Sequence, residues 1–378
     1  MDIAEVRTKI DDLDQRMLDL FLERMSLMGE VAKYKEEHHL PIEDRARERE
    51  VLARVMDRAG EMEEYSFYFF SKLMSLAKAR QNELLSSPSK VRALTERAIA
   101  RVEDLFPKTG SVACQGVEGS NAQAACDKLL PRGRILYMKT FKAVFDAVGS
   151  GLCQYGVLPI DNSLNGSVRA VYELLRERKF FIVRSTRLFI RHVLMAKPGV
   201  RLSEIRNVYS HPQALGQCSD FLDSLKGVEA IPYPNTASAA RMVAESEDRT
   251  AAAIAAPGCA ALYGLTPLKE DIQDNDNNQT RFICIAKEPV IYAGSNHLSV
   301  ILACANTPGA LNDVLSRLAA HGVNMNKLES CPVVGRNYEF IFFLEMDGSV
   351  QDAGVLSMLE DLERSCPSFD LLGNYAIV

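Results

Sequence analysis

Apolar residues recur at steps of three and four over the first 31 residues, and no proline interrupts them before Pro41. This spacing predicts one amphipathic helix of about 35 residues, which would be about 50 Å long. Two shorter helices are predicted from about Glu43 to Arg58 and from about Tyr65 to Leu85. Two short helices cannot cover the apolar stripe of so long a helix, so we expect the segment 1–86 to form a dimer. The stripe consists of Ile3, Val6, Ile10, Leu13, Met17, Leu20, Phe21, Leu27, Met28 and Val31.

The rhythm of the sequence changes after Ser86-Ser87-Pro88-Ser89, and a linking helix is expected within residues 87–109. Residues 110–288 then alternate short apolar, β-rich runs with helical stretches, which is typical of an α/β domain. So many strands over this length indicate two lobes with a ligand cleft between them. The expected strands are Val112–Gln115, Ile135–Met138, Gly156–Ile160, Phe181–Val183, Val193–Ala196, Val208–Tyr209, Val228–Ile231, Ala252–Ala255 and Phe282–Ala286.

Residues 297–378 follow a β-α-β-β-α-β order, which predicts a small α+β domain with a ferredoxin-like fold. The expected strands are Leu298–Ala305, Asn326–Pro332, Glu339–Met346 and Leu371–Val378, and the expected helices are Ala310–His321 and about Asp352–Cys366. The chain is therefore expected to be multidomain, with an all-α head, a two-lobed α/β domain and an α+β domain.

Composition argues against several classes of function. The 47% hydrophobic and 25% charged fractions are those of ordinary soluble proteins. The net charge of −6 has no long single-sign block, so neither a nucleic acid nor a membrane is expected as a partner. The N-terminus is too acidic for a signal peptide, and the apolar run from Ala251 to Leu265 is too short to span a bilayer. Nine scattered cysteines without a CxxC pair favour reduced thiols in the cytoplasm and no metal site.

Cationic side chains of the first helix are spaced to hold a small dianion. Arg24 and Lys35 are eleven residues apart, so they share a helix face to within about 20° and lie about 16 Å apart. Arg7 precedes Arg24 by seventeen residues and sits about 100° around the helix, so it is poorly placed for the same pocket. In an antiparallel dimer, Arg7 could reach the pocket of the partner.

The second and third helices add polar groups to this set. Asp44, Arg47 and Glu48 fall at i, i+3 and i+4, which puts a cation and two carboxylates on one helix face. Gln81 on the third helix adds a neutral donor. The alternative is that each of these side chains is an ordinary surface charge.

Together, these residues resemble the all-helical chorismate mutases. The matching pattern is Arg7-x-x-Ile10-x-x-Leu13-Asp14, Glu23-Arg24, Val31-x-x-x-Lys35 and Asp44-x-x-Arg47-Glu48. The resemblance implies a shared site in which the carboxylates of chorismate are bound by Arg7 of one subunit and by Arg24, Lys35 and Arg47 of the other. It also implies that Lys35 and Gln81 face the ether oxygen, while Glu48 and Asp44 face the ring hydroxyl. Ala77 departs from the family, which usually has a serine there.

The chemistry of that family suits these residue types. A Claisen rearrangement requires a folded substrate and donors aimed at the ether oxygen, where negative charge grows as the C–O bond breaks. It requires no nucleophile, general acid, general base or cofactor. We therefore assign catalysis to Lys35, Glu48 and Gln81 and expect no cofactor.

Three strand ends of the middle segment run into polar residues and then into a helix. Helix N-termini with free N–H groups bind carboxylates well, so three of them on one cleft would form a dicarboxylate site. Ordinary N-capping explains each one equally well on its own, and the sequence does not show that they converge. The three strand ends are Asn162-Ser163-Leu164-Asn165-Gly166-Ser167, Ser210-His211-Pro212-Gln213 and Asn235-Thr236-Ala237-Ser238.

These strand ends belong to a set of motifs that resembles prephenate dehydratase. The set is Leu158-Pro159-Ile160-Asp161-Asn162-Ser163, Gly166-Ser167-Val168, Ser210-His211-Pro212-Gln213-Ala214 with Gln217-Cys218, Ala237-Ser238-Ala239-Ala240, Tyr263-Gly264-Leu265 and Asn278-Gln279-Thr280-Arg281-Phe282. Thr-Arg-Phe is the catalytic motif of that family. The resemblance implies that Thr280 hydrogen-bonds the departing ring hydroxyl and that Arg281 binds a carboxylate. It further implies a prephenate cleft lined by Asn162, Ser163, His211, Gln213 and Ser238.

The reaction releases CO2 and hydroxide and forms an aromatic ring, so the enzyme mainly has to help hydroxide leave. A threonine hydroxyl is too weak an acid to do this alone, so we expect Thr280 to act as a positioned donor in a relay. His211 could be an acid or a helix cap. Asp161 stands where the family usually has glutamate, and Ala122 stands where it usually has serine.

The C-terminal segment contains two further motifs, Thr307-Pro308-Gly309-Ala310-Leu311 and Leu328-Glu329-Ser330-Cys331-Pro332. They resemble the phenylalanine-binding elements of ACT domains attached to prephenate dehydratases. The resemblance implies an L-phenylalanine site between two subunits, formed by Gly309, Ala310, Leu311, Glu329 and Ser330. Cys331 replaces the usual arginine. The alternative is a domain that binds no ligand and serves only as a dimer contact.

The sequence therefore predicts a bifunctional enzyme that converts chorismate to prephenate and prephenate to phenylpyruvate, under feedback control by L-phenylalanine. It is expected to be a homodimer or a larger homo-oligomer. Two alternatives stay open: a monofunctional dehydratase with a helical dimerisation head, and a sensor of aromatic acids with silent active sites.

Overall fold

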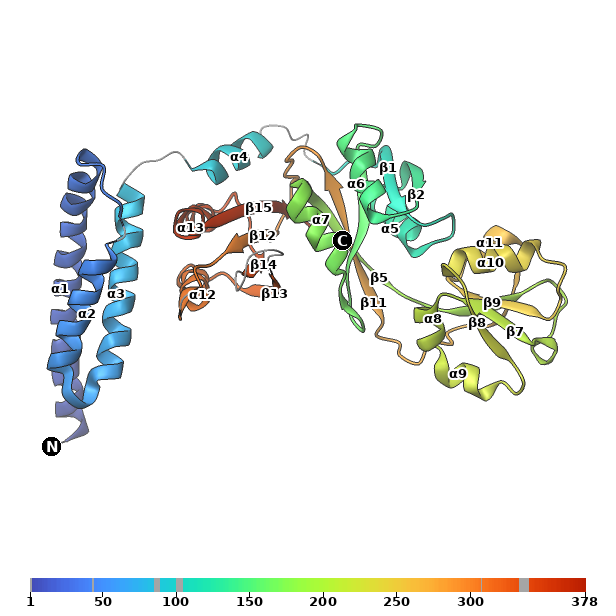
Figure 1. Cartoon of the computed structure of the whole chain (residues 1–378), viewed down its shortest axis with the longest axis horizontal. Coiled ribbons are helices and arrows are strands. Elements are labelled where there is room, and N and C mark those ends of the chain that lie inside the picture. The colour runs from blue at the N-terminus through green and yellow to red at the C-terminus, as the bar shows by residue number, and fades with distance from the viewer. Residues whose placement is uncertain (1, 43, 85–88, 100–104, 307, 333–339) are drawn as a thin grey trace.

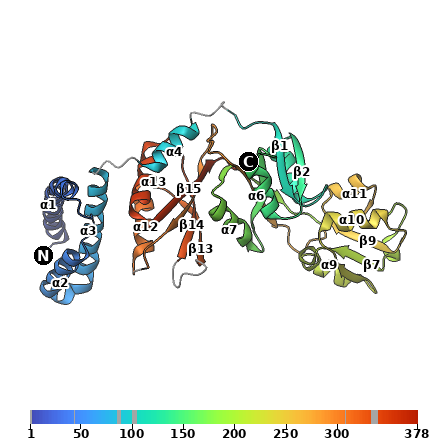
Figure 2. The same ribbon diagram turned by 45° about the horizontal axis from the view of Figure 1, so that its top comes forward.

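The computed structural model describes the chain except for residues 1, 43, 85–88, 100–104, 307 and 333–339. Three bodies follow one another along the longest axis of the molecule (Figure 1). The helical head lies at one end and the two-lobed α/β domain at the other. The C-terminal α+β domain lies between them although it comes last in the sequence, and Figure 2 shows the same order after rotation. The expected multidomain fold class is confirmed.

The head consists of α1 (Ile3–Glu37), α2 (Arg45–Ala59), a 3-10 turn (Gly60–Met62) and α3 (Glu63–Leu84). α2 begins later than predicted because Asp44 is its N-cap and accepts a hydrogen bond from the backbone N–H of Arg47 (3.0 Å). Glu43, where this helix was expected to begin, lies outside the described residues. Most of the apolar stripe of α1 is exposed within one chain. The buried apolar side chains of the described part of the head are Ala32, Met74 and Ala77.

The linking helix α4 (Lys90–Ile99) packs into the core of the C-terminal domain. Val91 and Ala98 of α4 belong to the same buried cluster as Leu298. Arg92 pairs with Glu360 at 2.6 Å. The expected boundary between head and linker, at residues 86–87, lies outside the described residues.

The first lobe of the α/β domain has six strands and three helices. The strands are β1 (Thr109–Gln115), β2 (Arg132–Met138), β3 (Tyr155–Asn162), β4 (Gly166–Ser167), β5 (Phe181–Phe189) and β11 (Gln279–Ala286). The helices are α5 (Asn121–Leu129), α6 (Phe141–Gly149) and α7 (Arg169–Arg178). The sheet order is β2-β1-β3-β11-β5, with β4 paired to β3, and β11 runs antiparallel to both of its neighbours.

The second lobe is built on a five-stranded sheet. Its strands are β6 (Val193–Ala196), β7 (Asn207–Ser210), β8 (Glu229–Pro232), β9 (Ala251–Ala255) and β10 (Thr266–Lys269). Its helices are α8 (Pro212–Gly216), α9 (Ser219–Ser224), α10 (Thr236–Glu245) and α11 (Gly258–Tyr263), with a 3-10 turn at Leu202–Glu204. The sheet order is β10-β6-β9-β7-β8. The strands predicted for this domain are all present within a few residues, whereas β4 and β10 were not predicted.

The C-terminal domain has the predicted order of elements. Its strands are β12 (His297–Ala303), β13 (Met325–Pro332), β14 (Phe340–Asp347) and β15 (Ser368–Tyr375), and its helices are α12 (Ala310–Ala320) and α13 (Ala353–Ser365). The antiparallel sheet runs β13-β14-β12-β15, as in a ferredoxin-like fold. Lys72 of α3 pairs with Asp313 of α12 at 2.6 Å, which joins this domain to the head.

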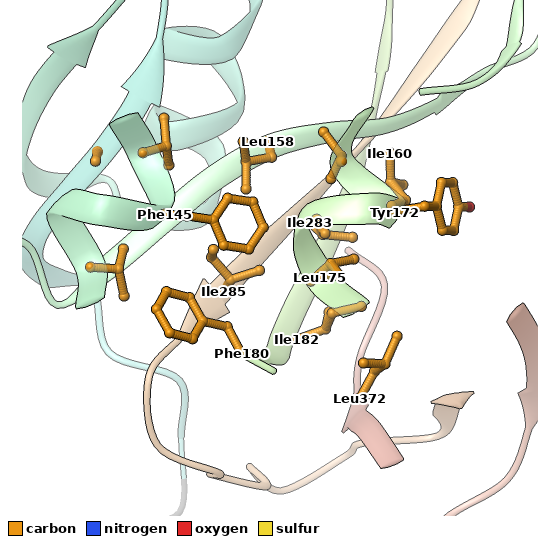
Figure 3. Close-up of a cluster of buried hydrophobic side chains, with 14 of the residues drawn as sticks. Phe145, Leu158, Ile160, Tyr172, Leu175, Phe180, Ile182, Ile283, Ile285 and Leu372 are labelled. Carbon is orange, nitrogen blue, oxygen red and sulfur yellow. The ribbon is translucent and has the colours of Figure 1, made fainter. Parts of the chain in front are cut away.

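The α/β and C-terminal domains share one hydrophobic core. Figure 3 shows Phe145, Leu158 and Ile283 of the first lobe in one buried cluster, with Leu372 of β15 at its edge beside Ile182. The chain beyond β15 also bonds to β5, since the N–H of Ser185 donates to the carbonyl of residue 376 at 3.0 Å. Burial of a large apolar side chain stabilises a protein by about 1.5–3 kcal/mol, so this shared cluster ties the two domains firmly together.

Within the described residues, none of the helices is both long enough and apolar enough to cross a membrane. All nine cysteines are free.

Candidate active sites

A cleft of about 540 Å³ lies between the two lobes of the α/β domain. The three polar strand ends noted in the sequence meet there, since Asn162, His211 and Asn235 all line it. Asn121 and Thr236, the first residues of α5 and α10, line it as well. Because helix N-termini favour anions, the cleft is suited to a ligand with more than one carboxylate.

The Thr280 hydroxyl oxygen accepts a hydrogen bond from Asn162 at this cleft. The Oδ1 atom of Asn162 accepts hydrogen bonds from the backbone N–H groups of Leu164 and Asn165, each at 3.0 Å. These bonds leave the Nδ2 atom of Asn162 as the donor toward Oγ1 of Thr280 (2.9 Å) and Oδ1 of Asn278 (2.8 Å). Since the Thr280 oxygen accepts this bond, its own proton is available to another acceptor.

Asn278 is a candidate site residue that was not named individually from the sequence. It lines the cleft and is 1% exposed. With Oδ1 engaged by Asn162, its Nδ2 atom is the remaining group, and that atom has no partner among the described residues. A buried donor without a partner is costly, which makes this amide a candidate contact for a ligand. The signal was present in the sequence, because Asn278 opens the Asn278-Gln279-Thr280-Arg281-Phe282 motif.

The second lobe contributes a capping histidine and a buried one. His211 is the N-cap of α8, and its Nδ1 atom accepts from the N–H of Gln213 at 3.2 Å. His192, which also lines the cleft, lies 2.9 Å from Oε1 of Gln217 through its Nε2 atom. Burial lowers the pKa of His192, and the contact with Gln217 only partly offsets this effect. His192 was not singled out from the sequence, and Gln217 was named there only as part of a motif.

Two serines expected in the cleft, Ser163 and Ser238, lie outside its described lining. The hydroxyl of Ser163 donates to the carbonyl of Asn277 (2.8 Å) and accepts from the N–H of Gln279 (2.9 Å). The N–H of Ser238 donates to Asn235, which caps α10 (2.7 Å). The Ser163 hydroxyl therefore supports the strand that borders the cleft, whereas Ser238 contributes its backbone N–H to the cap of α10.

Arg281 also lies outside the described lining of the cleft, so the structure does not bring it together with Thr280 there. Successive side chains of a strand point to opposite faces, so Thr280 and Arg281 cannot both face one cleft. Arg281 pairs with Asp161 at 2.7 Å and with Glu345 of β14 at 2.5 Å. These residues border a second cavity, of about 510 Å³, between the α/β and C-terminal domains.

The charges at this second cavity stabilise one another. Burial alone would raise the pKa of Glu345, but His297 and Arg281 lower it to about 2. Burial alone would lower the pKa of Arg281, whereas the Glu345 carboxylate raises it. Both groups are therefore charged at neutral pH.

Apart from its histidines, the described lining of the cleft contains one cationic residue, Lys139. It follows β2 directly and its side chain is exposed. The sequence reasoning did not select it. It is the residue best placed to neutralise a ligand carboxylate after Arg281 has been assigned elsewhere.

In the head, Arg24 and Lys35 of α1 each donate to a backbone carbonyl, and Arg7 lies near the N-terminal end of the same helix. The guanidinium of Arg24 donates to the carbonyl of Leu73 in α3 at 3.3 Å. The Nζ atom of Lys35 donates to the carbonyl of Ile42 at 2.6 Å. Arg7 is exposed near the other end of α1, and seventeen helical residues separate it from Arg24 by about 26 Å. One chain alone therefore does not bring Arg7 to the other cations.

Gln81 and Glu48 lie on the inner faces of the head. Gln81 is 5% exposed; its Nε2 atom contacts the sulfur of Met28 at 3.4 Å, and its Oε1 atom has no partner among the described residues. Glu48 pairs with Lys78 at 3.0 Å. Lys78 was not selected from the sequence, although it lies one turn before Gln81 on α3.

Arg47 and Asp44 make local contacts. Arg47 pairs with Glu50 at 2.7 Å, and both side chains are more than half exposed. Asp44 caps α2. The structure therefore places these two expected site residues at the N-terminus of α2, with their charged groups engaged by their own helix.

In the C-terminal domain, Gly309 has a φ of 85° and forms the N-cap of α12. A Cβ at this position would be strained by the backbone angle even though the space around it is open. Ala310 and Leu311 line a small cavity of about 150 Å³ together with Phe340 and Phe342. Thr307 lies outside the described residues.

The second expected effector element, on β13, lies away from this small cavity. Glu329 accepts a hydrogen bond from the hydroxyl of Ser167 in β4 at 2.6 Å. Ser330 is exposed, and Cys331 is buried in the shared core with Phe343. Within one chain, the described lining of the cavity at Gly309–Leu311 does not include β13.

Three family models match the chain. Chorismate mutase type II matches residues 6–82, prephenate dehydratase matches residues 112–290 and the ACT domain matches residues 299–363.

Curated relatives and a solved structure extend these matches. The bifunctional chorismate mutase/prephenate dehydratase of Stutzerimonas stutzeri is 30% identical, over 99% of this chain and 97% of its own length. An arogenate dehydratase/prephenate dehydratase of Arabidopsis thaliana is 33% identical, over 80% of this chain and 86% of its own. The prephenate dehydratase of Arthrobacter aurescens, solved in complex with L-Phe, superposes with a TM-score of 0.65 at 30% identity, covering 70% of this chain and 89% of that one.

Proposed function

The chain belongs to the family of bifunctional chorismate mutase/prephenate dehydratases, and we propose that its domains catalyse two consecutive reactions under the control of L-phenylalanine. The head converts chorismate to prephenate, and the two-lobed domain converts prephenate to phenylpyruvate, CO2 and water. The C-terminal domain binds L-phenylalanine. The proposed domains are residues 1–86, 110–288 and 297–378, with 87–109 as the linker, and the ranges matched by the family models support them.

The hydrogen bond from Asn162 to Thr280 carries the dehydratase assignment. Electrons from the breaking bond to the ring carboxylate enter the ring as CO2 leaves, and the ring C–O bond breaks with its electron pair. The Thr280 hydroxyl, oriented by Asn162, donates to that departing oxygen and stabilises its developing charge. A proton that arrives through a water relay completes the leaving water, because threonine cannot give up a proton on its own.

Substrate binding in this cleft rests on helix N-termini, amides and one cation. The first turns of α5 and α10 face the carboxylates from opposite lobes, and Lys139 adds a charge. Gln213 and His211 contact the substrate from the rim of the cleft, and Asn278 contacts it from the buried wall. The Ser163 hydroxyl supports the backbone beside the cleft, and the Asn235 side chain holds the backbone N–H of Ser238 at the start of α10.

Chorismate rearrangement takes place in the head. Lys35 and Gln81 donate to the ether oxygen, and Arg24 and Arg47 bind carboxylates, with Glu48 and Asp44 toward the ring hydroxyl. The buried, unpaired Oε1 atom of Gln81 indicates an amide whose polar groups are not satisfied within the described part of one chain. No proton transfer is needed, so positioning and charge stabilisation account for the rate.

A second copy of the chain completes the head. Leu13, Met17 and Leu20 on α1 are each more than half exposed, and the stripe continues over the length of the helix. Such a long apolar face is suited to an identical antiparallel helix, which would also carry Arg7 of one subunit to the pocket of the other. We therefore propose a homodimer or a larger homo-oligomer, located in the cytoplasm, which agrees with its free cysteines.

L-phenylalanine binds between the C-terminal domains of two subunits. Gly309, Ala310 and Leu311 come from one subunit, and Glu329 and Ser330 from the other. Within one chain, the described lining of the cavity at Ala310 and Leu311 does not include β13, which carries Glu329 and Ser330. This separation supports a site formed by two subunits.

One assay tests the proposal. Chorismate, prephenate and arogenate are supplied in separate reactions to the purified full-length chain, with and without L-phenylalanine, and both products are followed. We expect turnover of chorismate and prephenate. Turnover of prephenate alone would identify a monofunctional dehydratase, and binding without turnover would identify a sensor. The arogenate reaction tests the substrate named for the Arabidopsis relative.

A further inference from the structure

Two pairs of strand residues face each other across the junction of the α/β and C-terminal domains. Asp161 of β3 and Arg281 of β11 are directly paired in the first lobe, and Lys327 of β13 and Glu345 of β14 are directly paired in the C-terminal sheet. Each pair thus contains one cation and one anion. We call these four residues the charge clasp.

Each cation of the charge clasp bonds to the anion of the other domain. Arg281 lies 2.5 Å from Glu345, and Lys327 lies 3.3 Å from Asp161. Arg281 and Glu345 have side chains that are 5% and 8% exposed, so these charges depend on each other rather than on water. Glu329 of β13 adds a third contact between the domains, since it accepts a hydrogen bond from the hydroxyl of Ser167, the β4 residue that pairs with Asp161 of β3.

The charge clasp is adjacent to the Thr280 hydroxyl. The pair next to Asp161 and Arg281 in the same ladder is Asn162 and Thr280. On the other side the register shifts between Arg281 and Phe282, so a bulge interrupts the ladder there. A bulge loosens local pairing, so the β3–β11 ladder holds these two pairs only between the bulge and the end of β3, while β5 pairs with Thr280 and Arg281 on the other edge of β11.

We propose that Lys327 and Glu345 of the C-terminal domain are positioning residues of the dehydratase reaction. They hold Asp161 and Arg281 in place, and through them the Asn162–Thr280 hydrogen bond at the strand end. The C-terminal domain is in this respect a structural part of the dehydratase site, in addition to any role as a sensor. This inference rests on the proposed dehydratase function.

Glu345→Gln and Lys327→Met test the inference in the full-length chain. We expect the dehydratase kcat to fall at least about tenfold, with KM for prephenate within about twofold, because a small displacement of a catalytic group acts mainly on the chemical step. Lys327→Arg keeps the cation and should retain most of kcat. Mutase turnover and the thermal unfolding midpoint on the same samples report whether each variant is folded.

The matched control is Lys179→Met. Lys179 also pairs across the two domains, with Asp370 at 3.3 Å, but it is 69% exposed and lies outside the Thr280 ladder. This control should leave kcat unchanged.

Three results would overturn the inference: a wild-type kcat in both clasp variants, an equal loss in Lys179→Met, or a change in KM alone. If Glu345→Gln does not fold, Lys327→Met, whose side chain is partly exposed, decides the outcome. A wild-type chain that does not consume prephenate would instead refute the proposed function.

Discussion

The Nδ2 atom of Asn162 donates to Oγ1 of Thr280 over 2.9 Å, across the last regular pair of β3 and β11. The direction of this bond matters more than its length. Because two backbone N–H groups occupy Oδ1 of Asn162, the amide cannot be reversed without losing both bonds. The Thr280 proton is therefore directed away from Asn162, and the hydroxyl is prepared to donate to a substrate.

Asn162→Asp tests this direction. The carboxylate would accept the Thr280 proton, so the hydroxyl could no longer donate to the departing oxygen. We expect the dehydratase kcat to fall about a hundredfold or more, as is typical for loss of one preorganised donor. Thr280→Ala should be equally inactive, whereas Thr280→Ser should keep a substantial part of the activity. Steady-state assays with prephenate measure the loss, and mutase turnover serves as the control. A serine variant as inactive as the alanine variant would argue against a hydroxyl role.

Asn278→Asp distinguishes two roles of the Asn278 side chain, a contact with prephenate and the support of Asn162. The aspartate keeps an acceptor for Asn162 but has no N–H group to offer, whereas Asn278→Leu has neither. If the unpaired Nδ2 atom contacts prephenate, both variants should raise KM about tenfold or more, since a lost hydrogen bond to a charged group typically costs about 1.5–3 kcal/mol. Titration of prephenate in steady-state assays gives both constants. An aspartate variant with wild-type KM and kcat would show that Asn278 only supports Asn162.

Mixing two inactive heads tests the shared mutase site. Lys35→Ala should reduce mutase turnover about a hundredfold and leave prephenate dehydration nearly intact, because the lysine acts on the charge that forms at the ether oxygen. Arg7→Ala should also be inactive as a homodimer. A mixture of the two should recover up to one working site per heterodimer. Mass spectrometry confirms that heterodimers form, and heterodimers without recovered turnover would contradict the shared site.

The sequence singled out Thr280 as a candidate catalytic residue, and the structure places it at the cleft, whereas its neighbour Arg281 lies at the domain junction. Thr280 could be found because its motif is local, within five consecutive residues. Strand periodicity already implied that Arg281 points to the opposite face. Its partner Glu345, however, lies in another domain, and only the tertiary structure brings the two together.

The elements that the sequence did not predict have similar causes. β4 contains only two residues, and β10 includes Pro267 on an edge strand, so neither shows a β-strand pattern. The linking helix was predicted, but the burial of Val91 against the C-terminal domain depends on residues about two hundred positions away. In the head, one chain shows only the exposed apolar stripe of α1 and the distant position of Arg7, so the contribution of a second subunit stays a prediction.

Acid should weaken the junction between the α/β and C-terminal domains. The pKa of Glu345 is lowered from about 4.5 to about 2 in the folded chain, so its stabilising contribution is present above pH 4.5 and is lost as the pH falls toward 2. The shift corresponds to about 3 kcal/mol. Glu345→Gln should therefore unfold at a lower temperature than the wild type at pH 7, and this difference should shrink between pH 4.5 and pH 2. Thermal unfolding over a pH series measures it. A difference that is constant down to pH 2 would show that the Glu345 charge does not stabilise the fold.

L-phenylalanine binding should depend on the glycine at the start of α12. Gly309 has a φ of 85°, which lets the backbone there approach the amino and carboxylate groups of a ligand, and a valine would strain that backbone. Calorimetry should therefore detect binding to the wild type and none to Gly309→Val.

Binding alone does not produce inhibition, because the effector must favour one state of the enzyme over another. Glu329 offers such a difference, since it contacts Ser167 beside the charge clasp and is also expected to face the ligand. Glu329→Gln should thus reduce the inhibition of the dehydratase by L-phenylalanine more than it reduces basal turnover.

Cys331→Arg changes a buried residue of the shared core, so the stability of this variant must be checked before its affinity for L-phenylalanine is compared. If it folds, it should bind L-phenylalanine as tightly as the wild type or more tightly, because the arginine restores charge-assisted hydrogen bonds at the strand. Millimolar L-phenylalanine that gives neither heat nor a change in rate would leave this domain as a dimer contact and a support for Thr280.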